Sequence, residues 1–355
     1  MFQFNDLTII IPTYSNRYRF VIRTAEYWNN TGSDIIILDE SMDPMPKNLQ
    51  LLLPESSLYK HTPSESFYDR LKIATNLVKT PYVIICPDDN FMLHSTVHKC
   101  ILKIKEQPEL LACAGIYTWF TCYNGDIYSL EKISDLRLHN PLSDNISQRL
   151  IECQEVIFMY GVWRTRTLRT CVKMLPDKHS SPAVLLCTLQ CGLAYMGKWG
   201  EIRELMWLRS YEKPSASKKN GTNRNIRFQT WYEEKAYQSE VQETFSKMVA
   251  VLSEETQSSQ LEIDQNLKAA FKNFAELSIR QYEKEQSNNR VKKRRRIIQI
   301  IAPLSFKKAW RYYKYKNLPP GILLTSQLSW LEENNIQIDI EEVNNVKQFI
   351  KRFYA

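Results

Sequence analysis

The residues best suited to chemistry in this sequence are two adjacent carboxylates and an amide, Asp88, Asp89 and Asn90. They follow residues 82–86, an apolar run rich in β-branched and aromatic side chains that predicts a strand buried on both faces. In open α/β sheets, ligands bind beyond the carboxyl ends of the strands, where this sequence places the three polar side chains. Carboxylate oxygens there suit a hard divalent cation, and such a cation can neutralise a diphosphate. A polar turn after a strand is the alternative interpretation.

The elements that must position these acids are short apolar runs that alternate with helical segments. Apolar runs at 7–12 and 33–38 predict two strands, and a third is expected at 57–61. The second run also ends on a carboxylate, Asp39. Alternation of strands and helices predicts a parallel sheet with right-handed crossovers, so Asp39 and Asp88 are expected along one edge of it. The predicted fold class is therefore α/β.

The downstream half is predicted to contain both strands and helices. One strand is expected at 110–121, with Tyr117, Trp119 and Phe120 exposed near its end, and another at 204–209. Hydrophobic spacing predicts helices throughout the chain, at 18–29, 64–78, 95–107, 147–160, 165–174, 183–196, 228–252 and 261–285.

The sequence lacks several common signatures of ligand and metal sites. No GxGxxG follows the first strand and no GxxxxGK[ST] occurs, which argues against a dinucleotide fold and a P-loop. The eight cysteines form no CxxC pair and lie mostly among apolar neighbours. We therefore expect buried free thiols rather than metal or disulfide chemistry.

Length and charge divide the chain into parts. Its 355 residues, 43% of them hydrophobic, suffice for a large α/β domain with a sizeable core. Of the net charge of +8, residues 290–316 supply eleven Lys or Arg and no acid, which leaves −3 for the rest. A stretch rich in Ser, Asn and Lys at 213–227 predicts a mobile loop. We expect a sheet domain at 1–212, a helical segment at 228–289 and a basic amphipathic C-terminal extension at 290–355.

Three motifs follow one another in the first hundred residues: TIIIPTYSNR at 8–17, IIILDES at 35–41 and TPYVIICPDDNFM at 80–92. In order and spacing they resemble the GT-A fold glycosyltransferases, specifically the family 2-like enzymes that assemble bacterial surface polysaccharides. The resemblance covers residues 6–212 or so. It implies a GT-A fold, with a Rossmann-like and mainly parallel sheet flanked by helices.

The resemblance also implies a function and a set of site residues. It implies an inverting, divalent-metal-dependent transferase that moves a sugar from a nucleotide-activated donor to a glycan or lipid-linked acceptor. The metal, Mn2+ or Mg2+, would be held at Asp89 and Asn90, although many relatives carry a third acid in place of this amide. The residues that would line the donor are Pro12, Thr13, Tyr14, Arg17, Asp39, Arg70 and Asp88.

An inverting transferase also needs a base beside the acceptor hydroxyl. The resemblance implies a base roughly ninety residues after the metal motif, and Asp177 stands 88 positions beyond Asp89 (177 − 89). His179 is a competing candidate, because the ordinary pKa of histidine lies near the working range. The alternative for Asp177 is an ordinary turn or capping residue before a helix.

The basic stretch 290–316 joins cations to apolar and aromatic groups, a combination that suits an anionic membrane surface. No apolar run is long enough to span a membrane, and the N-terminus lacks a signal-peptide pattern. We therefore expect a cytoplasmic protein, peripheral on the inner face of the plasma membrane. An acidic protein partner, or nucleic-acid binding through the tail, is the alternative role of this stretch. A sugar-phosphate nucleotidyltransferase is a further alternative, against which the glycine-free first loop argues.

Overall fold

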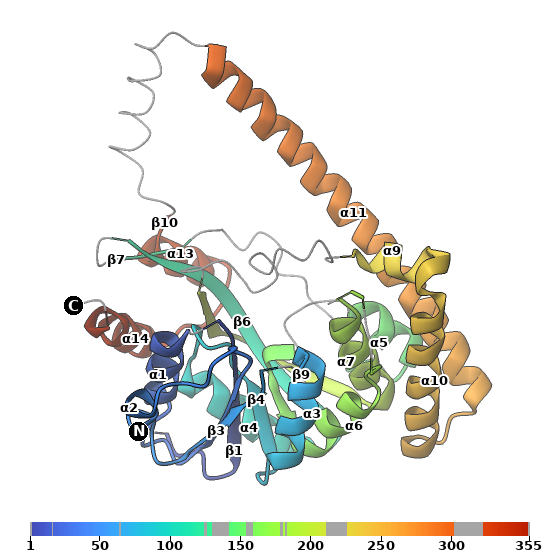
Figure 1. The fold of residues 1–355 in the computed structure, drawn as a ribbon, viewed down its shortest axis with the longest axis horizontal. Helices are drawn as coiled ribbons and strands as arrows, with labels where there is room; N and C mark the ends of the chain where they lie inside the picture. The colour runs from blue at the N-terminus through green and yellow to red at the C-terminus, as the bar shows by residue number, and fades with distance from the viewer. Residues whose placement is uncertain are drawn as a thin grey trace.

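A ten-stranded mixed sheet with helices against both faces forms the body of the protein in a computed structural model (Figure 1). Successive residues of the first strand enter different cores, Ile10 on one face and Ile9 and Ile11 on the other. This alternation shows that the strand is buried on both faces, as its continuous apolar run predicts. The structure describes residues 2–15, 17–63, 65–123, 126–129, 142–153, 159–177, 180–181, 183–210, 226–301 and 322–353.

The N-terminal half has the predicted alternation of strands and helices. Its four strands are parallel, in the spatial order β3-β2-β1-β4. The register sets Thr13 directly opposite Asp39, so the carboxyl ends of the first two strands lie side by side. The elements are β1 (Leu7–Thr13), α1 (Tyr18–Tyr27), β2 (Asp34–Asp39), α2 (Lys47–Gln50), β3 (Ser57–His61), α3 (Phe67–Leu77) and β4 (Tyr82–Ile85).

Beyond β4 the sheet is mixed. β8 lies between β4 and β6 and is antiparallel to both, whereas β6 and β9 pair in parallel. The predicted helix at 147–160 ends at Glu152, and residues 154–158 lie outside the described residues. The elements are β5 (Phe91–Met92), α4 (His94–Glu106), β6 (Leu110–Tyr123), β7 (Asp126–Ser129), α5 (Ile146–Glu152), β8 (Val162–Arg164), α6 (Thr165–Lys173), α7 (Ala183–Met196) and β9 (Lys198–Ser210).

The helical segment after β9 shares a core with the sheet. One cluster of buried side chains includes Ile10 and Val83 of the sheet together with Trp231 and Phe271 of the helices. The segment expected at 228–289 is therefore packed on the sheet domain. Most of the loop predicted at 213–227 lies outside the described residues. The elements are α9 (Phe228–Glu233), the 3-10 helix η2 (Lys235–Tyr237), α10 (Gln238–Glu255) and α11 (Gln260–Ile301), whose far end extends away from the body in Figure 1.

The described residues 322–353, in the second half of the expected C-terminal extension, pack on the sheet. They form β10 (Ile322–Leu323), α13 (Leu324–Glu333) and α14 (Ile340–Arg352). Leu328 and Val343 of these helices share a core with Phe120 of β6, which is fully buried. The expectation that Phe120 is exposed is therefore wrong, because the helices at the end of the chain cover its face of the strand. Of the basic stretch, residues 302–316 lie outside the described residues.

All eight cysteines are free thiols, and all except Cys122 are buried. Their burial raises the pKa of several of these thiols, among them Cys86 and Cys171, so the reactive thiolate is disfavoured. The expectation of buried free thiols is confirmed.

A carboxylate of α14 caps the start of α4. That helix has no side-chain cap of its own, since Leu93 occupies the capping position. Glu342 instead accepts hydrogen bonds from the backbone N–H groups of His94 and Ser95, the second at 3.0 Å, and from the Ser95 hydroxyl at 2.6 Å. It satisfies donors that the first turn of a helix leaves open and adds a negative charge where the helix dipole favours one.

We expect Glu342→Ala to lower the free energy of unfolding by about 2 kcal/mol, because the lost cap leaves part-buried N–H groups without an acceptor. Urea denaturation of the full chain measures the change. Glu341→Ala, which removes the neighbouring exposed carboxylate, is the control and should change stability by less than about 0.5 kcal/mol. Equal losses in the two variants would contradict the capping role.

Candidate functional site

A buried ion-pair network stands at the carboxyl ends of β1 and β4. Arg17, which is 6% exposed, donates from Nε and Nη2 to the two carboxylate oxygens of Asp88, at 2.8 Å each. The same Nη2 donates to Asp89 at 2.5 Å. The Thr13 hydroxyl donates to Asp88 at 2.6 Å. Four of the predicted site residues are thus in one hydrogen-bonded group.

The network carries nearly balanced charge. Arg23, 1% exposed, donates from Nη2 to the backbone oxygen of Asp89 at 3.2 Å, and Thr24 donates its hydroxyl to the backbone oxygen of Asp88 at 2.7 Å. Two guanidinium groups therefore lie within electrostatic reach of two carboxylates. Burial, and after it the charge of Asp88, raise the pKa of Asp89 to about 7 against the lowering effect of Arg17.

Asp39 and Arg70 hold the neighbouring end of the sheet together. The Asp39 carboxylate is fully buried and accepts hydrogen bonds from the Ser41 N–H at 2.9 Å and the Tyr59 hydroxyl at 2.6 Å. Arg70 donates to the backbone oxygen of Thr13 at 3.0 Å and pairs with Glu40. Its Nε is buried and has no hydrogen-bond partner within the described residues. Arg70 therefore supports the end of β1 and keeps one donor unused.

The loop after β1 presents its side chains toward this network. Pro12 and Tyr14 are partly exposed, and the Tyr14 ring lies 5.1 Å from the Arg17 guanidinium. Ser15 has φ of 53°, in the left-handed region that non-glycine residues rarely adopt. Such a conformation costs of order 1 kcal/mol and persists only where the surroundings impose it. Here the Arg17 ion pairs fix the far side of the turn.

Asn90 anchors the end of β9. Its amide oxygen accepts a hydrogen bond from the Ser210 N–H at 2.7 Å. Asp89 Oδ1, by contrast, makes no hydrogen bond with any described residue. No group of three or more His, Cys, Asp or Glu gathers in the part of the chain that the structure describes. This donor set fits a cation held by one carboxylate together with phosphate oxygens and water, and does not fit a cage of protein ligands.

Of the two candidates for the catalytic base, the structure describes Asp177. The Asp177 side chain is 72% exposed and forms ion pairs with Lys72 at 3.1 Å and Lys247 at 2.8 Å. Hydrogen bonds from Lys247 and Lys72 lower the pKa of its carboxyl, which weakens it as a base. His179 lies outside the described residues. Both roles stay predictions.

The sequence did not single out three residues that border the acids: Arg23, Thr24 and Tyr160. Arg23 lies three positions after Phe20 on the apolar face of α1, and a charged residue on an apolar helical face is a signal that could have been used. Tyr160 comes just before β8, is partly buried and lies within electrostatic reach of Asp89. Nothing in its local pattern distinguishes it from a core tyrosine.

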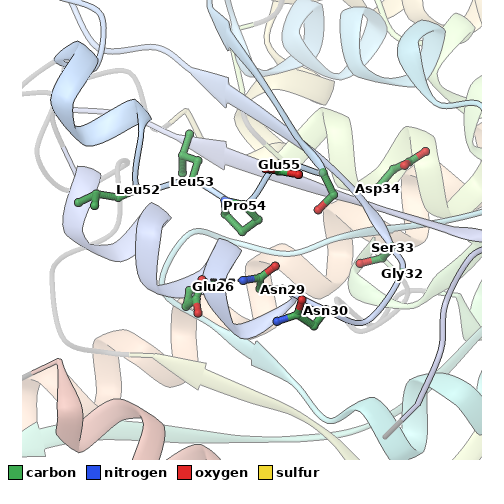
Figure 2. Close-up of a pocket in the computed structure, with 11 residues that line it drawn as sticks. Glu26, Asn29, Asn30, Gly32, Ser33, Asp34, Leu52, Leu53, Pro54 and Glu55 are labelled. Carbon is green, nitrogen blue, oxygen red and sulfur yellow. Dashed lines mark hydrogen bonds between the residues drawn. The ribbon is translucent and has the colours of Figure 1, made fainter.

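A separate hollow of about 650 Å³ lies at the amino end of β2, away from the carboxyl ends that carry the acids (Figure 2). It opens where β2 begins, at Asp34, whereas Asp39 ends the same strand at the site. None of the predicted site residues lines it. Its polar lining includes Glu26, Asn29, Asn30, Ser33, Asp34 and Glu55.

Comparisons with known proteins find distant structural neighbours. No protein-family model matches the chain, and no curated protein matches it. Staphylococcus aureus TarS 1–349 in complex with UDP-GlcNAc is 13% identical, with a TM-score of 0.47 over 86% of this chain and 78% of that one. TarS 1–349 with UDP is 12% identical, with a TM-score of 0.44 over the same shares. Because these TM-scores are below 0.5, the likeness does not decide function, which rests on the site itself.

We expect Arg17→Ala to lower the free energy of unfolding by about 3–5 kcal/mol, because it leaves buried carboxylates unpaired. Adding Asp88→Asn should restore part of this loss, since the uncompensated charge is then removed. Urea denaturation of both variants measures the coupling. Arg19→Ala, at an exposed position on the same helix, is the control. Additive effects of the Arg17 and Asp88 substitutions would contradict the network.

Proposed function

We propose that this chain is a glycosyltransferase that moves a sugar from a nucleotide-activated donor to a glycan or lipid-linked acceptor. The observation that supports the proposal is the buried network of Arg17, Asp88 and Asp89 at the carboxyl edge of a parallel sheet. Ligand sites of open α/β sheets are built at this edge. A protein rarely buries two adjacent carboxylates unless they are paired and used, because removing each from water costs several kcal/mol.

The donor nucleotide would lie across the ends of β1 and β2. Pro12, Thr13 and Tyr14 border this position, and Asp39 lies at its far side. Arg70 donates to the Thr13 backbone oxygen at the end of β1 and places a guanidinium beside this position. The side-chain hydrogen bonds of Arg17 to described residues go to Asp88, Asp89 and Tyr14. We therefore assign Arg17 to holding the acids rather than to direct phosphate binding.

We assign the divalent cation to Asp89 alone. Its Oδ1 is available, while both oxygens of Asp88 accept from Arg17 and the Asn90 oxygen accepts from Ser210. Mn2+ or Mg2+ bound there would stabilise the negative charge of the leaving nucleoside diphosphate. The guanidinium groups of Arg17 and Arg23 already balance the two carboxylates. A diphosphate therefore needs the extra positive charge, so the cation and the nucleotide should bind together.

The reaction would join the acceptor oxygen to the anomeric carbon while the bond from that carbon to the diphosphate oxygen breaks. The acceptor hydroxyl gives its proton to a base, and the nucleoside diphosphate leaves with the bonding electrons. Asp177 and His179 stay the candidates for this base. Inversion at the anomeric carbon is part of the proposal.

We expect UDP-GlcNAc or UDP to raise the melting temperature of the full chain only when Mn2+ or Mg2+ is present. Ligand at a hundred times its Kd stabilises the native state by about 2.7 kcal/mol. Asp89→Ala should abolish both the shift and the release of UDP, while Asp43→Ala, at an exposed carboxylate, should keep both. Undiminished turnover by Asp89→Ala would remove the metal assignment. A shift with nucleoside triphosphates and release of diphosphate would point to a nucleotidyltransferase.

We also propose that residues 290–316 hold the protein on an anionic membrane surface. No helix in the described part of the chain is both long and apolar enough to cross a membrane. Each cation near the lipid adds about 1 kcal/mol. We expect the chain to co-sediment with phosphatidylglycerol vesicles at low salt, and to lose this when Lys292, Lys293 and Arg294 become Gln. Preference for an oligonucleotide over the vesicles would instead favour nucleic-acid binding.

A further inference from the structure

Four side chains with aromatic or cationic groups share one face of β6 and β9. The parallel register sets Tyr117 opposite Trp207 and Trp119 opposite Arg209. Because side chains alternate along a strand, these four point to the same side of the sheet. The opposite face carries Phe120 and its neighbours, which α13 and α14 cover. We call Tyr117, Trp119, Trp207 and Arg209 the aromatic platform.

The platform is tightly stacked. The Arg209 guanidinium lies 3.8 Å from the Trp119 ring centroid and 5.3 Å from that of Trp207. The Tyr117 ring centroid lies 5.3 Å from that of Trp207, whose other neighbour, Tyr160, lies at 4.4 Å. Such stacking holds the guanidinium in a fixed orientation and leaves its edge free to bind an anion.

Arg209 is the member of the platform with unused binding capacity. Arg209 forms no ion pair with a carboxylate among the described residues. Trp207 is 3% exposed, and its buried indole N–H has no acceptor among the described residues. Tyr117, Trp119 and Arg209 are partly exposed. A stacked arginine without a counter-charge is suited to bind an anion, so the binding capacity of the platform rests on Arg209.

The platform borders the acids on the side away from the donor. The residue after Arg209 is Ser210, whose N–H bonds to Asn90 at 2.7 Å. Tyr160, which packs on Trp207, also lies in the electrostatic field of both Arg209 and Asp89. In the sheet, β1 and β2 lie on one side of β4, and β8 and β6 lie on the other. A second substrate that reaches the donor at Asp89 from the β6 side would therefore contact the platform.

We propose that the aromatic platform binds the acceptor, and that this acceptor presents a sugar ring next to an anionic group. The electropositive C–H face of a sugar ring suits the negative face of the Trp119 indole. The Arg209 guanidinium supplies the charge that selects a phosphate or carboxylate beside that ring. The assignment to the acceptor rests on the proposed transferase function, whereas binding of a charged sugar does not.

The test uses the full chain and three probes: glucose 6-phosphate, glucose and inorganic phosphate. Binding is followed by quenching of tryptophan fluorescence and by calorimetry. The wild type should bind glucose 6-phosphate about tenfold more tightly than either of the other probes, a difference of about 1.4 kcal/mol. Arg209→Gln should lower the affinity for glucose 6-phosphate to that for glucose. Arg166→Gln, which removes an exposed arginine of α6, should leave all three affinities unchanged.

Trp119→Ala should weaken the binding of glucose and of glucose 6-phosphate by a similar factor. Trp119→Phe, which keeps a ring and protects folding, should retain most of the affinity for both probes. The UDP-GlcNAc thermal shift is measured on the same samples and should persist in every platform variant. The proposed role of the platform is overturned if wild type and Arg209→Gln bind glucose 6-phosphate equally well. It is also overturned if the wild type shows no preference for glucose 6-phosphate over the other probes. The predicted probe affinities without any nucleotide shift would support the platform and reject the transferase.

Discussion

The bidentate pair between Arg17 and Asp88 is the interaction on which the candidate site depends. It joins the loop after β1 to the end of β4, across 71 residues of chain. Burying these carboxylates without compensation would cost several kcal/mol per ion. The guanidinium groups of Arg17 and Arg23 offset this desolvation cost, and the Thr13 hydroxyl adds a third hydrogen bond to Asp88. The site is therefore built close to neutral, and the diphosphate of the proposed donor would have to bring its own counter-charge.

Segments distant in sequence keep the short strand after the acids in place. β5 contains only two residues, which pair with β9, and α4 starts immediately after it. Glu342, 248 residues from His94, fixes the first turn of that helix. Phe91 of β5 lies in the same core as Val343 and Ile350 of α14. The last helix thus belongs to the support of the acids, although it follows the most basic stretch of the chain.

Local sequence patterns predicted the strands and the acids at their ends, because continuous apolar runs and their polar termini are local signals. They did not predict which elements meet. Phe120 was expected to be exposed because it follows two aromatic residues near a strand end, yet helices that start more than 200 residues later cover it. The antiparallel direction of β8 and the capping by Glu342 are likewise set by pairing across long distances. The donor-lining role of Arg17 stays a prediction, and its buried partners Asp88 and Asp89 are visible only in three dimensions.

Asn90 shows how one departure from the expected motif fits the rest of the site. A third carboxylate at this position would add a negative charge to a network that Arg17 and Arg23 only just balance. The amide brings no charge, and its oxygen still accepts from the Ser210 N–H at 2.7 Å. That bond ties the end of β9 to the acids and thereby fixes Arg209, the residue before Ser210. The bond to Ser210 engages one of the two lone pairs of this amide oxygen, so the residue that stands in place of a third acid also helps to position the aromatic platform.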